Sequence, residues 1–138
     1  MRADRLLKLA KFLMKVKKQN FNYAKILLIN CKTQACAIGY CPTIFPKHWK
    51  VCEYPYKVEG TIKSFYVHLR TESENINWTD VVNDAMKFFD ITHDEAVALF
   101  ASFSTDYKML KELPESATPK QVANNIIKFV ELKKARKI

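Results

Sequence analysis

Residues 118–134 decide the fold class; they read TPKQVANNIIKFVELKK. Thr118, Pro119 and Gln121 are the start signal of an α-helix, because threonine caps the first turn, proline is tolerated there and glutamine completes a capping box. Apolar residues then recur at the three- and four-residue spacing of one helix face, at Val122, Ile126, Ile127 and Val130. The cations Lys133, Lys134, Arg136 and Lys137 favour the negative end of the helix dipole.

Upstream of this stretch, two further helices are predicted from their starts. Thr79 precedes an apolar set (Val81, Val82, Ala85, Phe88 and Phe89), and Thr92 with Glu95 forms a second capping box before another set (Ala96, Leu99, Phe100 and Phe103). A fourth helix is expected at the other end of the chain, from about Asp4 to Lys18, with Asp4 as its cap. Its apolar stripe, which we expect to pack on the core, comprises Leu6, Leu9, Ala10, Leu13 and Val16.

The middle of the chain gives weaker signals. The apolar run Ile26 to Ile29 is too short to separate a buried helix turn from a buried strand, and of the two we favour the helix. Thr33 can cap a short helix over residues 35–38 that stops at Gly39, before Pro42 and Pro46. Over residues 51–70 the period changes to two, because Phe65, Val67 and Leu69 alternate with polar residues. This predicts a β-hairpin that turns at Glu59 and Gly60.

These elements together predict a mainly α fold (α or α+β), a single compact domain over residues 1–138. It has about five helices and at most one small β-hairpin. A chain of 138 residues with 49% hydrophobic residues has material for one core. No apolar run reaches the roughly 20 residues of a membrane span, and lysines at 8, 11 and 15 interrupt the N-terminal stripe, so we expect a cytoplasmic protein without a membrane segment.

The net charge of +9 is unevenly distributed. Residues 1–30 carry +7 and residues 31–70 carry +4, whereas residues 71–100 carry −6 and residues 101–138 carry +4. Basic ends around an acidic middle are typical of a protein that attracts a polyanion, and equally of a protein whose own segments attract each other.

The small number of glycines argues against the enzyme classes that are recognised by glycine-containing sequence motifs. Only Gly39 and Gly60 occur, so phosphate-cradling loops, dinucleotide fingerprints and a nucleophile elbow are excluded. The histidines at 48, 68 and 93 form no helical zinc-binding pair. We therefore expect no cofactor, and we favour a protein without catalytic activity over an enzyme.

Four cysteines and one histidine within 22 residues are the remaining chemical cluster: Cys31, Cys36, Cys41, His48 and Cys52. They are candidate zinc ligands, although their spacing is wider than that of usual zinc pairs. A second hypothesis makes Cys31 or Cys36 a nucleophile near a helix start, activated by a histidine such as His48. The hypothesis we favour is that these cysteines are small buried residues, because small side chains let segments pack closely.

The segment Cys31 to Pro42 resembles a family of uncharacterised small bacterial and phage proteins built around the motif C-G-T-x-x-C-x-x-G. Phe88 to Thr92, the Leu99-Phe100 pair and Ala117 to Pro119 also match its pattern. The resemblance implies a bacterial or phage origin and brings no assigned activity. Lys32 stands where the family usually has glycine, which weakens the idea of a catalytic or anion-binding loop at that point.

Three functional hypotheses follow from the sequence. The leading one is a small accessory or regulatory protein that acts by binding another protein. The first alternative is a basic nucleic-acid-binding protein that uses lysines and interleaved aromatic residues: Lys11, Lys15, Trp49, Lys50, Tyr66 and Arg70. For the aromatic residues of this segment we favour the other interpretation, that Trp49, Phe65 and some of the tyrosines belong to the core. The second alternative is a cysteine-dependent enzyme or zinc site at the cluster above.

Overall fold

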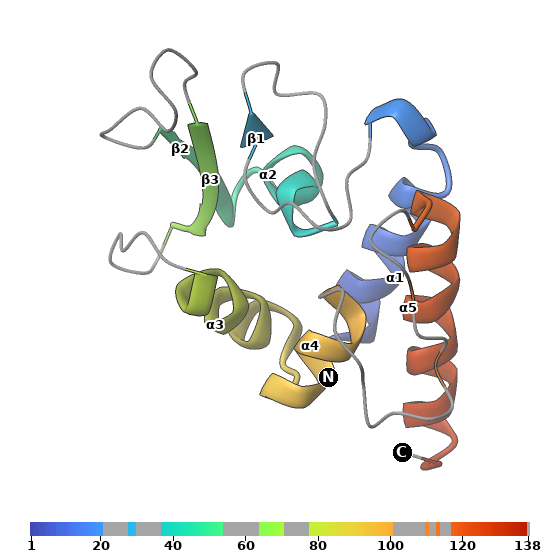
Figure 1. Ribbon diagram of the computed structural model, residues 1–138. Helices are drawn as coiled ribbons and strands as arrows, with labels where there is room; N and C mark the ends of the chain where they lie inside the picture. Colours follow the sequence, from blue (N-terminus) through green and yellow to red (C-terminus); the bar gives the residue numbers. More distant parts are fainter. Residues whose placement is uncertain are drawn as a thin grey trace.

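Five α-helices and a small antiparallel sheet make up the described part of a computed structural model of the chain (Figure 1). The structure describes residues 1–20, 28–29, 37–53, 64–70, 78–100, 110, 113 and 117–137. The helices are α1 (Ala3–Leu13), α2 (Cys41–Ile44), α3 (Trp78–Phe89), α4 (His93–Phe100) and α5 (Pro119–Lys134), with 3-10 turns η1 (Lys18–Asn20) and η2 (Ile38–Tyr40). The strands are β1 (Leu28–Ile29), β2 (Trp49–Glu53) and β3 (Ser64–Leu69). The predicted mainly α fold is confirmed.

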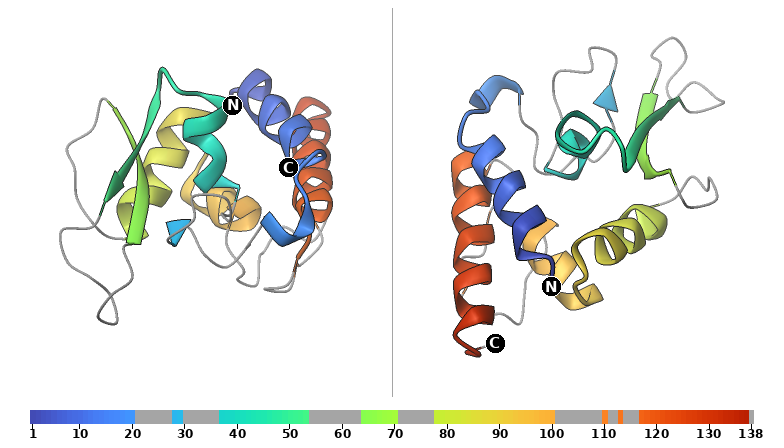
Figure 2. Two further views of the ribbon diagram at one scale, coloured as in Figure 1. Left: turned by 90° about the horizontal axis from the view of Figure 1, so that it is seen from above. Right: turned by 180° about the vertical axis from the view of Figure 1, so that it is seen from behind.

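The two ends of the chain form one helix pair. Helices α1 and α5 lie side by side and run in opposite directions along one edge of the molecule (Figures 1 and 2). The stripe predicted for the first helix is buried at Leu6, Leu9, Ala10 and Leu13, and α5 buries Val122, Ala123, Ile126, Phe129 and Val130. These buried side chains make the helix pair a large part of the core. Burial of apolar surface stabilises a fold by about 25 cal/mol per Å².

The predicted limits of the first helix are wrong at both ends. The helix begins at Ala3 and its N-cap is Arg2, because the Arg2 carbonyl accepts the first helical hydrogen bond from Leu6 N (3.1 Å) and the Arg2 amide is held by Phe89 O (2.8 Å). Asp4 lies inside the first turn instead. The helix ends at Leu13, where hydrogen bonds to Phe12 O and Leu13 O tighten the chain into i+3 turns.

Both predicted capping boxes are confirmed. Thr92 N donates to Glu95 Oε1 (2.9 Å) and Glu95 N donates to Thr92 Oγ1 (3.2 Å) at the start of α4. The same reciprocal bonds join Thr118 and Gln121 at the start of α5, at 2.8 and 3.2 Å. Helix α3 begins at Trp78, so Thr79 lies in its first turn and does not precede the helix as expected.

Long-range pairing overrides the helix predicted near residue 28. Leu28 and Ile29 form strand β1, which pairs with Phe65 and Ser64 of β3. The run of apolar residues is therefore a strand at this point, since pairing with partners 35 and 37 residues away supplies hydrogen bonds that periodicity cannot reveal. The predicted cap at Thr33 lies outside the described residues.

The predicted stop at Gly39 is also wrong. Gly39 lies buried within η2, and the chain continues directly into α2. Pro42 does not prevent this, because it occupies the first turn of α2, where its missing N–H has no helical acceptor.

The predicted hairpin strands pair antiparallel as β2 and β3, with Trp49 opposite Leu69 and Val51 opposite Val67. The sheet order is β1-β3-β2, so β1 adds a third, two-residue strand. Its expected turn at Glu59 and Gly60 lies outside the described residues. His68, expected on the polar side of the strand, is buried because α3 supplies it with a partner, as described below. In the part of the chain that the structure describes, every helix is too short or too polar to span a lipid bilayer.

Candidate nucleic-acid interface

The fold gathers the excess positive charge on one pair of segments. Residues 1–20 and 117–137 carry thirteen Lys and Arg but only two acidic residues, a net +11. The rest of the chain carries ten basic and twelve acidic residues, a net −2. Because α1 and α5 are neighbours, basic segments separated by almost a hundred residues in the sequence form one region in space.

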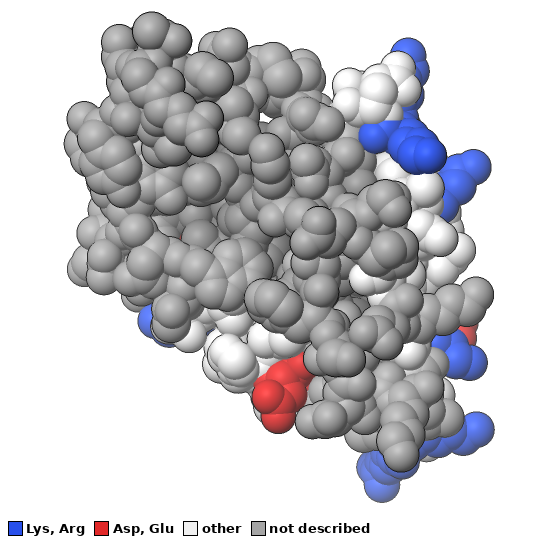
Figure 3. Space-filling view, in the orientation of Figure 1, with Lys and Arg blue, Asp and Glu red and all other residues white. Residues whose placement is uncertain are grey.

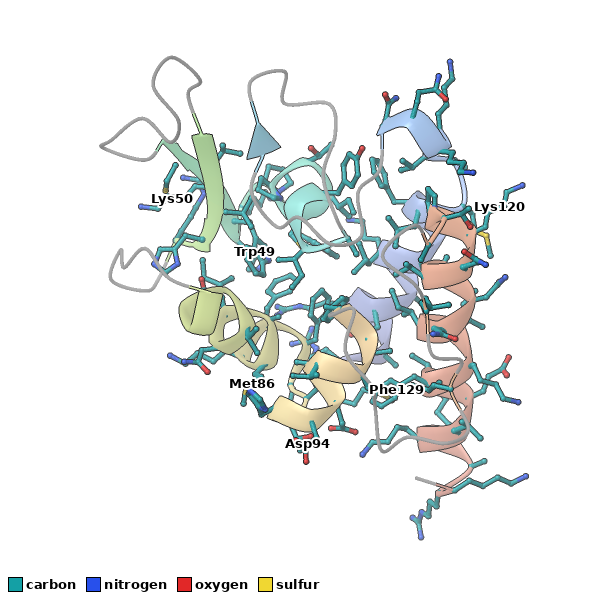
Figure 4. All side chains as sticks on the ribbon, in the orientation of Figure 1. Trp49, Lys50, Met86, Asp94, Lys120 and Phe129 are labelled. Carbon is teal, nitrogen blue, oxygen red and sulfur yellow. The ribbon has the colours of Figure 1, made fainter. Side chains whose placement is uncertain are left out.

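The orientation of each helix turns its lysines outward. With Leu6, Leu9 and Leu13 facing the core, Lys11 and Lys15 lie on the opposite side of the α1 segment and are exposed. On α5 the buried Val122, Ile126 and Phe129 leave Lys120, Lys128 and Lys134 exposed. In Figure 4, Lys120 points away from the molecule whereas Phe129 points inward.

We call the exposed lysines of this edge the basic face: Lys11, Lys15, Lys17, Lys18, Lys120, Lys128, Lys134 and Lys137. Most of the blue side chains visible in Figure 3 lie along η1 and α5. Lys8 is left out, because its Nζ lies 5.3 Å from the centre of the Phe45 ring, over α2.

The lysines of the basic face have no carboxylate within ion-pair distance among the described residues. Other cations of the same two segments are already paired: Arg2 with Asp4 (3.2 Å) and Lys133 with Glu95 (2.9 Å). Glu131 is the one exposed acidic residue on α5. The predicted attraction between basic and acidic segments of the chain therefore occupies few of the cations in residues 1–20 and 117–137. The positive charge of the basic face is not neutralised by these ion pairs.

Glu95 fastens α4 to the end of α5. Burial of the Glu95 carboxylate acts to raise its pKa, but hydrogen bonds from the Thr92 amide and hydroxyl and the ion pair with Lys133 outweigh burial and lower the pKa below its ordinary value. The carboxylate is therefore charged at neutral pH, and it holds Lys133 away from the basic face.

The residues predicted from sequence for nucleic-acid binding fall into two separate places. Lys11 and Lys15 belong to the basic face. Lys50 lies on β2 and the exposed Arg70 follows β3, on the side of the molecule away from α5 (Figures 1 and 4), and Arg70 Nε donates to Pro46 O (3.1 Å). Tyr66 lies on β3 opposite Cys52.

Trp49 cannot stack on a base, because its exposed fraction is 0%. Its indole packs edge-on against Phe88 of α3, with ring centres 5.5 Å apart, and points toward the interior in Figure 4. The indole N–H has no hydrogen-bond acceptor among the described residues. The burial of Trp49 confirms the favoured interpretation of this segment, in which the tryptophan belongs to the core.

The predicted cysteine cluster is only partly visible. Cys31 and Cys36 lie outside the described residues. Cys41 is fully buried in α2, with its Sγ 4.0 Å from Ala37 O, while Cys52 is half-buried on β2 and His48 is exposed beside the Phe88 ring. Within the described ranges no three His, Cys, Asp or Glu side chains gather closely enough to hold a metal ion.

One polar pair was missed from the sequence. His68 Nδ1 lies 2.5 Å from Asp84 Oδ2, and the same oxygen accepts a hydrogen bond from Leu69 N (3.1 Å). Both side chains are almost completely buried, at 2% and 4% exposure. Sixteen residues separate a strand position from a helix position here, and no local pattern announces such a pair.

Comparison of the chain with protein-family models, with curated proteins and with solved structures found no match. The resemblance to small bacterial and phage proteins therefore stays a prediction.

Proposed function

We propose that this protein binds nucleic acid through the basic face. The observation that supports the proposal is the net +11 of residues 1–20 and 117–137, whose exposed lysines share one edge of the molecule. Lysine ammonium groups neutralise phosphates and release condensed counterions, which is the main source of sequence-independent affinity for nucleic acid. We also propose a cytoplasmic location, in which such a partner is present and the thiols of Cys41 and Cys52 stay reduced.

Binding of a partner protein receives less support. A docking surface of that kind usually exposes a sizeable apolar patch. Among the described residues, Val51 at 42% is the only large hydrophobic side chain that is exposed. An acidic protein would compete for the same lysines, so the experiment below includes one.

The proposal is tested by neutralising four lysines of the basic face, two on each helix segment: K11Q, K15Q, K120Q and K128Q. We expect the quadruple variant to bind a fluorescein-labelled 20-base-pair DNA duplex at least about 100-fold more weakly than the unchanged protein at low salt, since each phosphate contact contributes. All four positions are exposed, so the fold should persist, which circular dichroism checks.

A control variant neutralises two exposed cations on the other side of the molecule, K47Q and R70Q, and so removes two charges where the quadruple variant removes four. We expect the control to bind the DNA duplex within about threefold of the unchanged protein, because these two cations lie outside the proposed contact with nucleic acid. Equal losses in the two variants would overturn the assignment to the basic face. Binding of polyglutamate as tight as binding of DNA at the same charge concentration would overturn the assignment to nucleic acid.

A further inference from the structure

We infer that the basic face binds double-stranded nucleic acid in preference to single strands and contacts the phosphates of the duplex. This inference rests on the function proposed above. The shared chemistry is the phosphate backbone of a duplex, whether of DNA or of RNA. The inference is carried by the residue types on α1 and α5 and by the rigidity of these two helices.

The basic face offers no aromatic platform among the described residues. Proteins that grip single strands stack the bases on aromatic rings. The one aromatic residue of α5, Phe129, is fully buried, and Phe12 of α1 is half-buried against the Tyr40 ring, with centres 5.5 Å apart. A single strand on this face would leave its bases without stacking partners, whereas the bases of a duplex stack on one another.

The exposed groups of α5 match a phosphate backbone. Outward positions carry ammonium and amide groups at Lys120, Asn124, Lys128 and Lys134, and one carboxylate, Glu131, lies between the last two lysines. Such groups make the contacts that fix a protein on a duplex without reading its sequence. Gln121 is less available, because its side-chain oxygen accepts a hydrogen bond from Thr118 N (2.8 Å).

The lysines are held at fixed spacings. A capping box begins α5, and Phe129 and Ile126 anchor the helix in the core. The 14 residues from Lys120 to Lys134 span about 21 Å at 1.5 Å per residue. Along the axis of a duplex one strand carries a phosphate about every 3.4 Å. Because the strand winds around the axis, a straight helix of this length faces only the phosphates on its own side of the duplex. The helix backbone that carries these cations is already ordered before binding, so only the lysine side chains have to be ordered against the phosphates.

The test compares three labelled probes of equal length by fluorescence anisotropy with the full chain: a 20-base-pair DNA duplex, a 20-base-pair RNA duplex and a 20-nucleotide oligothymidine. We expect at least one duplex to bind about tenfold or more tightly than the single strand at the same salt concentration. A single strand on this face lacks the stacking of its bases on aromatic rings, whereas binding of a duplex through its phosphates does not depend on such stacking. We also expect DNA duplexes of different sequence to bind within about threefold of one another.

The outcomes separate this inference from the proposed function. Tighter or equal binding of oligothymidine would overturn the preference for duplexes and leave nucleic-acid binding in place. Absence of binding to all three probes at low salt would overturn the proposed function and this inference with it. The pair K120Q and K128Q should weaken the duplex complex by about tenfold or more, whereas K47Q should not, as expected for phosphate contacts confined to the basic face.

Discussion

At the scale of single residues, the His68–Asp84 pair ties the sheet to α3. One carboxylate oxygen of Asp84 serves both the imidazole of His68 and the backbone N–H of Leu69. Two donors directed at one buried acceptor leave it well satisfied, and buried polar groups are tolerated on that condition. The pair therefore fixes how β3 lies on the helix, and it positions the buried Val67 and Leu69 beside it.

We predict that D84A destabilises the protein by about 3 kcal/mol, because removal of the carboxylate leaves a buried imidazole and a backbone N–H without their acceptor. D84N should cost less, since its amide oxygen still accepts one of these bonds. Urea unfolding followed by circular dichroism measures both. The exposed D94N is the control and should lie within about 0.5 kcal/mol of the unchanged protein. An unchanged midpoint for D84A would show that the pair does not hold β3 to α3.

At the scale of secondary-structure elements, signals that act within a few residues were predictable and pairings between distant elements were not. Thr92 with Glu95, and Thr118 with Gln121, announce helix starts because the hydrogen bonds they make span three residues. Leu28 and Ile29 are strand residues only because Phe65 and Ser64 lie beside them. Asp4 illustrates the intermediate case, since a capping residue type was present but contacts with α3 moved the helix start.

The Glu95 carboxylate gives a prediction about pH at this scale. Its pKa is lower in the folded protein than its ordinary value of 4.5, so its contribution to stability is present above that value and is lost as the pH falls through the folded pKa. The variant E95Q keeps an acceptor for the Thr92 amide but lacks the charge that pairs with Lys133. We expect E95Q to be less stable than the unchanged protein at pH 7, by on the order of 1 kcal/mol.

Chemical unfolding from pH 7 down to pH 3 checks this prediction. The difference between the two proteins should shrink as the pH falls, because protonation removes the same charge from the unchanged protein. E131Q, on the exposed side of α5, provides the comparison and should change little at any pH. A difference that stays constant across this range would mean that the Glu95 charge contributes nothing to the packing of α4 on α5.

At the scale of the whole molecule, the pairing of α1 with α5 turns two basic segments into one surface. The sequence revealed the charge and the amphipathic pattern of each segment separately. That the first and last helices would be neighbours did not follow from either pattern, because any two apolar stripes of similar length could have paired. Sequence reasoning therefore found Lys11 and Lys15 but placed their partners at Trp49 and Arg70, on the sheet, and not at Lys120 and Lys128.

The salt dependence of duplex DNA binding tests the central claim most directly. If the basic face neutralises phosphates, the logarithm of the association constant falls linearly with the logarithm of the salt concentration, by about 0.9 for each phosphate neutralised. Eight lysines on the face predict a slope of about −4 or steeper, with at least half of them in contact. A slope near zero, or one left unchanged by K11Q, K15Q, K120Q and K128Q together, would contradict the account.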